Sequence, residues 1–419
     1  MQIGIIADDL TSATDGAIQF ARVGFKSIVT LDPSHVQDLS RWPVISIDAD
    51  SRSGTSAQAA ARIAECVTAL RYRDLLYKTV DSTIRGHLAV ELLAAQIASG
   101  RPRTLLAPAF PANGRTTRGG RQYLHDIPLG RTSFSHDPYH PVSDDDIGSI
   151  LARAGVHGVR LLNRAALRDP TAVDAALAGA SCVVADAETD EDLEAVVRAV
   201  ADPREVLWVG SPGLARALGR FFVPEGDVAE QPSHARRLLV AVGSLNPTSR
   251  RQLDALRCRL DCIVVEIDAT LALNNPANAG QVALDAVAVT PTLLSVAQTI
   301  VVTSSGVSAG SQTSAVATVR VADAIACAVE TLQDIFPFDG FVLTGGDTAA
   351  HIARRLGVTA IQLDREFSPG VAVGTFTGAI CARVLTKAGG FGNDATLVGA
   401  CQYLRGNGVA AGTSKGDFD

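Results

Sequence analysis

The chain has 419 residues, of which 47% are hydrophobic and 19% charged, and its formal net charge is −7. A single hydrophobic core rarely grows beyond about 250–300 residues, so the length predicts two domains. The acidic balance argues against a nucleic-acid partner, because non-specific binding to nucleic acid depends on Lys and Arg neutralising phosphates.

The beginning of the chain, its apolar runs and its cysteines all bear on the compartment. The first residues, MQIGIIA, have the pattern of a strand with no cationic segment before it, unlike a secretion signal. No apolar run approaches the roughly 20 residues of a membrane-spanning helix. The seven cysteines include no C-x-x-C pair and lie mostly in apolar stretches, as buried reduced thiols do. We therefore expect a cytoplasmic protein without a membrane partner.

In the first half of the chain, short apolar runs alternate with helical patterns. The runs predicted as strands are Ile3–Ala7, Ser27–Leu31, Val44–Asp48, Leu75–Val80, Thr104–Ala109, Val159–Leu162, Cys182–Ala185 and Val206–Val209. Helical spacing of apolar residues marks Ser12–Val23, Ser56–Leu70 and Arg85–Ala98. Because the strands are almost continuously apolar, we expect a mostly parallel sheet covered by helices on both faces.

A break in this pattern divides the chain. Residues 223–237 contain two prolines, a glycine and several charges without periodicity, which is typical of a linker. The alternation then resumes, with strands predicted at Leu238–Val242, Cys262–Ile267, Thr299–Thr303, Phe341–Thr344 and Ala360–Leu363, and helices at Thr248–Arg259, Ser314–Leu332, Thr348–Leu356 and Thr375–Leu385. We predict an α/β fold of two domains, 1–222 and 238–405, each a mostly parallel sheet flanked by helices. Residues 406–419 are predicted to fray.

Two adjacent acids, Asp8 and Asp9, end the first predicted strand just before a helix. Ligands of open α/β sheets gather at this edge, outside the carboxyl ends of the strands. One Asp, or the following Thr11 or Ser12, is needed to cap the helix. Two acids exceed that need, so we expect at least one to orient a substrate hydroxyl or to accept its proton.

Two further segments of the first half carry groups suited to an anion. Asp81, Ser82 and Arg85 follow the strand Leu75–Val80, and Arg115 lies in a long Pro- and Gly-rich loop after a later strand. Arg holds a carboxylate or phosphate in a bidentate grip. A capped helix with a surface Arg would explain the first segment equally well, and a solvated turn the second.

Three glycine-bearing turns follow strands of the second half, and they predict a nucleotide site. They contain Ser244, then Gly345, Gly346, Asp347 and Thr348, and finally Lys387, Gly389 and Gly390. Glycines let backbone N–H groups approach a phosphate. Lys387 is suited to neutralise a phosphate, and Asp347 to reach a Mg²⁺ shared with it.

Familiar signatures of other enzyme classes are missing or incomplete. The chain has no G-x-x-x-x-G-K-[ST], and no G-x-G-x-x-G follows its first strand. Residues 306–310, GVSAG, match the nucleophile elbow of hydrolases, but the one histidine after them, His351, lies in a predicted helix. We therefore expect a flexible connection there.

In combination, these motifs resemble the four-carbon acid sugar kinase family. The matching segments run in order through nearly the whole chain: ADDLTSATD from Ala7, KTVDSTIRG from Lys78, APAFPANGRTT from Ala107, GSLNPTS from Gly243, TGGDTA from Thr344, SPGVAVG from Ser368 and TKAGGFG from Thr386. Ser12 stands where the family usually has Gly, and Asp347 where Glu is common.

The resemblance implies ATP-dependent phosphorylation of threonate, erythronate or 3-oxo-tetronate at the 4-hydroxyl, with the active site in a cleft between the domains. It implies that the acid sugar lies near Asp8, Asp9, Asp81, Ser82 and Arg85, and that ATP lies in the second domain. The acid used, its stereochemistry and the identity of the base stay open. A homodimer is expected from the frequency of dimers alone. An NAD-dependent sugar-acid dehydrogenase and a non-catalytic sugar-acid sensor are the alternatives.

Overall fold

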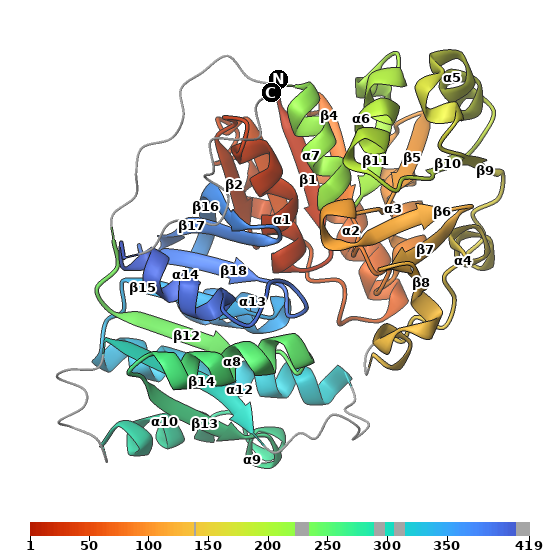
Figure 1. The fold of residues 1–419 in the computed structure, drawn as a ribbon. Helices are drawn as coiled ribbons and strands as arrows, with labels where there is room; N and C mark the ends of the chain where they lie inside the picture. The colour runs from red at the N-terminus through yellow and green to blue at the C-terminus, as the bar shows by residue number, and fades with distance from the viewer. Residues whose placement is uncertain (138–139, 223–233, 289–297, 306–314, 408–419) are drawn as a thin grey trace. The chain divides into compact units, whose positions relative to one another are not determined.

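The computed structural model describes residues 1–137, 140–222, 234–288, 298–305 and 315–407. The chain divides into two compact units, Met1–Ala229 and Glu230–Asp419 (Figure 1). Most of the predicted linker, the GVSAG motif and most of the predicted frayed tail lie outside the described residues, so these three remain predictions.

The main sheet of the first unit is parallel throughout. Its order is β2-β3-β1-β4-β11-β5-β10-β9. The strands are β1 (Ile3–Ala7), β2 (Ser27–Thr30), β3 (Val44–Asp48), β4 (Leu75–Thr79), β5 (Arg103–Ala107), β9 (Val159–Leu162), β10 (Cys182–Ala185) and β11 (Val206–Gly210). Because both faces are covered, nearly every strand residue is buried.

Helices cover both faces of this sheet. Along the sheet, the connection from β1 to β2 runs in one direction, and the connections from β3 to β4 and from β4 to β5 run in the other. Because such connections are right-handed, the helix of the first connection lies on one face of the sheet and the helices of the other two lie on the opposite face. Accordingly α1 (Leu10–Ala21) packs beside α7 (Pro212–Phe221), and α2 (Ser56–Leu70) packs beside α3 (Leu88–Ser99). The helices of the outer half are α4 (Ile147–Arg153), α5 (Pro170–Ala178) and α6 (Asp190–Ala199).

The Arg115 loop is more ordered than the sequence predicts. It forms an antiparallel sheet of β6 (Arg115–Arg118), β7 (Arg121–Leu124) and β8 (Ile127–Pro128). The buried Thr117 hydroxyl donates to Gln122 Oε1 at 2.7 Å across the first hairpin. Gly119 and Gly120, both with positive φ, form the turn between β6 and β7. Because paired glycines are typical of loops, the sequence alone predicts a loop here.

The second unit is mostly parallel, with an antiparallel edge. Its order is β13-β14-β12-β15-β18-β17-β16. The strands are β12 (Leu238–Val242), β13 (Ile263–Asp268), β14 (Thr299–Ser305), β15 (Gly340–Thr344), β16 (Val358–Ser368), β17 (Val371–Gly378) and β18 (Arg383–Lys387). The helices are α8 (Pro247–Arg259), α9 (Ala269–Asn274), α10 (Asn278–Ala288), α12 (Ala315–Ile335), α13 (Gly346–Arg355) and α14 (Thr396–Leu404). Helices α8 and α14 pack together, as do α10, α12 and α13.

One predicted element is wrong and one begins later than predicted. Residues 375–385 form the end of β17 and the start of β18 rather than a helix. Pairing of β17 with both β16 and β18 outweighs the local helical pattern. The helix predicted from Arg85 begins at Leu88, so the residues at 81–87 form a turn.

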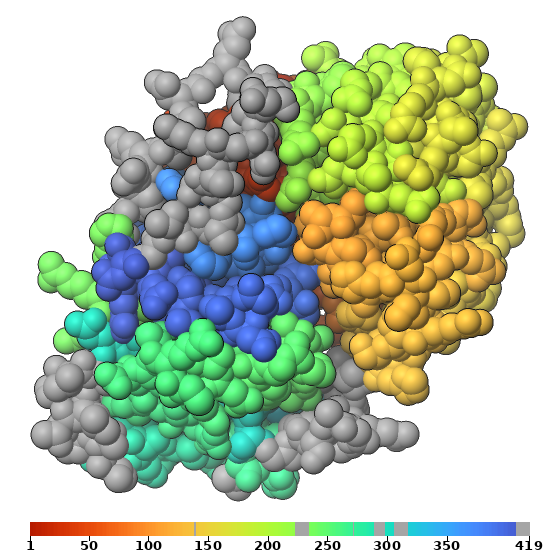
Figure 2. Space-filling model, in the orientation of Figure 1, coloured from red at the N-terminus to blue at the C-terminus, as the bar shows by residue number. Residues whose placement is uncertain are grey.

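The residues of β1, β4, β12 and β15 are all buried, and Figure 2 shows one face of the surface that side chains form. All seven cysteines are free thiols. Across the described ranges, we find no helix with the length and apolar character that crossing a bilayer requires.

Candidate functional site

Polar residues of the first unit gather where three neighbouring strands end. Asp8 follows β1, Arg52 follows β3 and Asp81 follows β4, and these strands lie side by side in the order β3-β1-β4. The crossovers change direction at β1, which makes this edge the topological switch point of the sheet. Open α/β sheets bind ligands at such a point.

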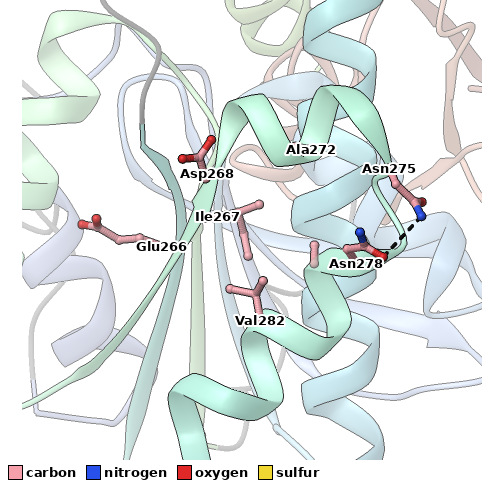
Figure 3. A pocket seen from close by; sticks show the side chains of 8 residues that line it. Glu266, Ile267, Asp268, Ala272, Asn275, Asn278 and Val282 are labelled. Carbon is pink, nitrogen blue, oxygen red and sulfur yellow. Dashed lines mark hydrogen bonds between the residues drawn. The ribbon is translucent and has the colours of Figure 1, made fainter.

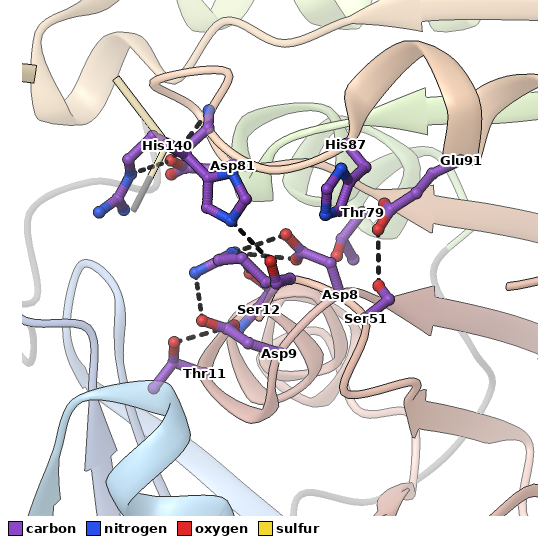
Figure 4. A network of polar contacts seen from close by, with 12 residues as sticks. Asp8, Asp9, Thr11, Ser12, Ser51, Thr79, Asp81, His87, Glu91 and His140 are labelled. Atoms are coloured by element: carbon purple, nitrogen blue, oxygen red, sulfur yellow. Dashed lines mark hydrogen bonds and ion pairs between the residues drawn. The ribbon is translucent and has the colours of Figure 1, made fainter. Parts of the chain in front are cut away.

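Arg52 is held between the two acids that the sequence singled out, Asp8 and Asp9, which Figure 4 labels. Its Nε donates to Asp8 Oδ2 at 2.7 Å and its Nη2 to Asp8 Oδ1 at 2.8 Å, a bidentate pair. Its Nη1 donates to Asp9 Oδ2, and its Nη2 also to Ser12 Oγ at 3.0 Å. The three charged side chains therefore form one unit, which we call the Arg52 clamp.

The two acids of the clamp have different further contacts. Asp9 caps α1, since its Oδ1 accepts from the Ser12 N–H at 2.7 Å and from the Thr11 hydroxyl at 3.0 Å. Asp8 makes no such cap. Each Asp8 oxygen accepts one hydrogen bond from Arg52, and a carboxylate oxygen has a second lone pair that can accept from a ligand hydroxyl. The geometry favours Asp8 over Asp9 for contact with a substrate.

Charge compensation keeps Asp8 ionised although it is buried. Burial raises the pKa of Asp8, but the positive charges of Arg52 and Lys78 outweigh it and leave the pKa below its ordinary value. The same pairing raises the pKa of Arg52 well above its usual range, against the effect of burial. At neutral pH Asp8 can accept a hydrogen bond from a hydroxyl.

Beneath the clamp lies a buried ion pair between β4 and α3. Lys78 Nζ lies 2.9 Å from Glu91 Oε2, and both side chains are almost fully buried. The Ser51 hydroxyl donates to Glu91 Oε1 at 2.6 Å, one residue before Arg52. The pair therefore anchors the turn from which Arg52 extends.

Arg85 extends from a strained turn beside the clamp. Its Nε donates to Asp81 Oδ2 at 2.5 Å, and the Thr83 hydroxyl donates to the same oxygen at 2.6 Å. Ile84 has φ of 53°, unusual for a β-branched residue and typical of functional turns. Gly86 has φ of 85°, and a Cβ there would lie 3.3 Å from Asp8 Oδ2. The turn therefore places Gly86, the neighbour of Arg85, against the Asp8 carboxylate.

The remaining residues predicted for this site contact it less directly. Ser82 is buried, and its carbonyl accepts from Gln122 Nε2 at 2.8 Å, which ties the turn to the small sheet. Arg115 is also buried; burial lowers its pKa, while the charge of Asp81 raises it and that of Arg85 lowers it. Arg115 therefore adds positive potential near Arg85.

Sequence reasoning missed Arg52. It lies in DADSRSG, directly after the strand predicted at Val44–Asp48. The rule that directed attention to Asp8 and Asp81, a polar side chain after a strand, applies equally to Arg52. His140 was also missed: its Nε2 lies 2.6 Å from the Arg52 carbonyl oxygen, and no local pattern connects these residues (Figure 4).

The three glycine turns of the second unit converge. They follow β12, β15 and β18, which are neighbours in the sheet. A Cβ on Gly345 would lie 3.5 Å from the Ser244 nitrogen, and one on Gly389 would lie 2.1 Å from Ser244 Oγ. A Cβ on Gly243 would overlap the Thr348 side chain. Gly243 and Gly389 therefore leave room for the neighbouring turn, whereas Gly345 is favoured by its φ of 100°.

The turn after β15 leads into a helix whose first N–H groups lack a side-chain cap. Helix α13 starts at Gly346, and its N-cap residue Gly345 has φ of 100° and no side-chain acceptor. N–H groups without a side-chain cap, together with the positive end of the helix dipole, suit a phosphate. Thr348 lies buried in the first turn, next to Asp347.

Lys387 supports the third turn from within. Its side chain is fully buried, and its Nζ donates to the carbonyls of Ala388, Gly389 and Phe391 at 2.9, 3.2 and 3.2 Å. An ammonium has three N–H donors, and these carbonyls of its own turn are among their acceptors. Lys387 therefore stabilises the shape of the turn, and its positive charge lies buried beneath the turn's backbone.

Among the residues that the structure describes, no three His, Cys, Asp or Glu side chains gather as a metal cage would require. A Mg²⁺ held chiefly by phosphates and water needs one or two carboxylates, and Asp347 fits that demand. A cavity of about 120 Å³ between β13 and α10 is lined by Ile267, Ala272 and Val282 and contains none of the predicted site residues (Figure 3).

Two family matches together cover most of the chain. Residues 3–218 match the family described as "Sugar-binding N-terminal domain", and residues 239–397 match "Nucleotide-binding C-terminal domain". The first match contains the Arg52 clamp and the Arg85 turn. The second contains all three glycine turns.

The relatives span nearly the full chain. A D-threonate kinase from Salmonella typhimurium is 32% identical over 429 residues, covering 96% of this chain and 98% of its own. A D-erythronate kinase from Heliobacterium modesticaldum is 28% identical and covers 96% of each. A 3-oxo-tetronate kinase from Methylobacterium radiotolerans is 28% identical, covering 94% of this chain and 96% of its own.

Two solved structures resemble this one. A protein from Salmonella typhimurium described as a putative tRNA synthase has a TM-score of 0.77 and 22% identity, covering 95% of this chain and 98% of its own, and so shares the fold. A Bordetella bronchiseptica protein, solved with bound citrate as a domain-swapped dimer, is 30% identical with a TM-score of 0.50, and covers 98% of this chain and 100% of its own.

Proposed function

Because this chain belongs to the four-carbon acid sugar kinase family, we propose that it transfers the γ-phosphate of ATP to the 4-hydroxyl of a four-carbon sugar acid. One observation carries the proposal: each unit gathers its polar groups at the carboxyl edge of its sheet. One set offers carboxylates and guanidiniums, which suit a hydroxy acid. The other offers backbone N–H groups in glycine turns, which suit phosphates.

In the first unit, Arg85 binds the substrate carboxylate, and Arg115 adds positive potential. Asp81 and Ser82 shape this part of the site. Asp8, kept ionised by Arg52, accepts a hydrogen bond from the reacting hydroxyl and orients it. Asp9 fixes Arg52 and the start of α1, so its effect on the substrate passes through the clamp.

In the second unit, the nucleotide phosphates bind the N–H groups of the turns that hold Ser244, Gly345–Thr348 and Gly389-Gly390. Lys387 holds the last turn in shape. Asp347 is the proposed protein ligand of the Mg²⁺ that accompanies ATP, a metal that neutralises phosphate charge during transfer. Phosphoryl transfer depends mainly on positioning and charge stabilisation, and both sets of groups supply these.

The test is a coupled assay of ADP release with Mg-ATP and a panel of acids. The panel contains both enantiomers of threonate and erythronate and 3-oxo-tetronate, with glycerate and glucose as controls. D-threonate is the first candidate, because the D-threonate kinase is more similar to this chain than the other two relatives are. ADP release with one tetronate supports the proposal. ATP binding without release on any acid, or NAD binding in place of ATP, contradicts it.

A variant tests the carboxylate assignment. Arg85→Ala is expected to lower kcat/KM for the acid by about 30-fold or more, since losing a partly buried charge contact costs about 2 kcal/mol or more. The matched control is Arg121→Ala, whose side chain is half exposed on the small sheet and pairs with Asp145 at 2.8 Å. Equal effects of the two substitutions would contradict the assignment.

We also propose a homodimer, to be checked by light scattering.

A further inference from the structure

A carboxylate of the protein itself lies on Arg85. The short 3₁₀ helix Ser133–His136 ends at Asp137, whose Oδ2 accepts from Arg85 Nη1 at 3.3 Å. In the same segment Phe134 lies under the guanidinium, with 5.3 Å between Arg85 Cζ and the ring centroid. The Arg85 and Asp137 side chains are 26% and 15% exposed, so solvent reaches this contact.

Arg85 holds its two carboxylates unequally. The contact with Asp81 is 2.5 Å long, and Thr83 and the Arg85 backbone N–H also donate to the same Asp81 oxygen. The contact with Asp137 is close to the limit of a hydrogen bond. The Asp81 contact therefore belongs to the framework of the turn, whereas the Asp137 contact can be exchanged for another carboxylate.

Asp137 keeps its own position without Arg85. Its Oδ1 accepts from the His140 N–H at 3.0 Å, and its backbone N–H donates to the Phe134 carbonyl at 3.2 Å. Releasing Arg85 therefore removes one contact of the carboxylate and leaves the turn closed. Solvent already reaches the Asp137 side chain, which is 15% exposed.

We propose that Asp137 occupies the place of the substrate carboxylate on Arg85 and acts as a specificity-determining side chain. This inference rests on the proposed function of Arg85. A sugar acid displaces Asp137 from Nη1 and supplies an equivalent carboxylate, so the charge of Arg85 stays compensated. A neutral sugar of the same length displaces Asp137 without replacing it, and so binds poorly. The competing carboxylate selects for acids at some cost in affinity.

The size of this cost follows from competition. If Asp137 occupies Arg85 for most of the time, the site is competent in a fraction of about 0.1–0.3 of the molecules, and the apparent affinity falls by that factor. Asp137→Asn keeps the Oδ1 acceptor for His140 and removes the negative charge. We expect KM for the preferred acid to fall by about three- to tenfold, with kcat within about twofold of wild type.

Two controls isolate the charge. Asp137→Glu keeps a carboxylate and is expected to leave KM equal or higher. Asp126→Asn removes an exposed carboxylate that pairs with Arg118 on the small sheet, and is expected to change nothing. Tryptophan fluorescence during urea unfolding checks that each variant is folded.

The outcomes separate this inference from the proposed function. Wild-type turnover together with an unchanged or raised KM in Asp137→Asn overturns the inference alone. A fall in KM with Asp137→Glu overturns it as well, since charge would then not be the cause. If the wild-type protein phosphorylates none of the acids, the proposed function fails and the inference fails with it. A fall in KM confined to Asp137→Asn supports both.

Discussion

Replacing Arg52 with methionine should destabilise the first unit by several kcal/mol. Methionine fills much of the same space, but it leaves Asp8 and Asp9 without their shared cation. The two acids are only 2% and 6% exposed, and the Arg52 side chain is 17% exposed. Removing one partner of a buried pair typically costs about 3–5 kcal/mol. Because Arg52 has some contact with water, we expect the lower end, about 3 kcal/mol.

Urea unfolding followed by tryptophan fluorescence measures this loss. The two tryptophans of the sequence, Trp42 and Trp208, both belong to the first unit, so fluorescence reports on that unit. The matched control is Arg62→Met. Arg62 lies 3.7 Å from Asp50 and its side chain is 53% exposed, so its loss should cost at most about 1 kcal/mol. Equal destabilisation by the two substitutions would refute the reasoning.

The pH dependence gives a second check on the same variant. In the wild-type protein, burial raises the pKa of Asp8, but Arg52 and Lys78 reverse this and hold it below the unfolded value of 3.8. Its contribution is thus present above that value and is lost as pH falls through the folded pKa. Without Arg52, burial raises the pKa of Asp8 with less opposition. Protonation of Asp8 at low pH then removes the cost of burying its unpaired carboxylate. The difference in stability between wild type and variant should be larger at about pH 8 than at about pH 5.

Three further predictions concern the nucleotide turns. Gly389→Ala places a Cβ 2.1 Å from Ser244 Oγ and should cost about 1–3 kcal/mol of stability without nucleotide, seen as a lower Tm. In Gly390→Ala the added Cβ lies 3.5 Å from its nearest atom, Asn246 Nδ2, so the Tm should stay the same. The same Cβ should raise KM for ATP by keeping a phosphate from the backbone. An unchanged KM would mean that no phosphate approaches Gly390. Lys387→Met should raise KM for ATP about tenfold through the lost turn contacts and leave KM for the acid unchanged. An equal rise in both KM values would point to general misfolding.

The parallel strands were predictable because their signal is local. Runs such as Ile3–Ala7 and Leu238–Val242 are apolar throughout, and a parallel sheet buried on both faces requires that pattern. The helix predicted at 375–385 was wrong because the structure of this segment depends on contacts that are distant in the sequence. Its strands exist because β17 pairs with β16 and β18, and pairing partners cannot be read from a window of eleven residues.

The candidate site residues could be singled out one by one from the sequence, but their pairings could not. Asp8 and Asp81 follow the strands β1 and β4, so position alone singles them out as candidates, whereas Lys387 is the last residue of β18 and was singled out by the Gly-Gly turn after it. That Asp8 binds Arg52, 44 residues away, depends on β3 lying beside β1. The donors of Lys387 are likewise directed at its own turn, a choice that residue type leaves open.

These pairings change how binding in the first unit should be understood. Asp8, Arg52, Asp81 and Arg85 are buried or partly buried charges, and each is compensated by another before any ligand arrives. Such charges are stable in a folded protein because they are paired. A substrate with its own carboxylate therefore binds by exchange, and substitutions within the clamp should weaken both stability and binding. Asp137 alone among the residues argued above competes with the substrate, so its substitution should improve binding.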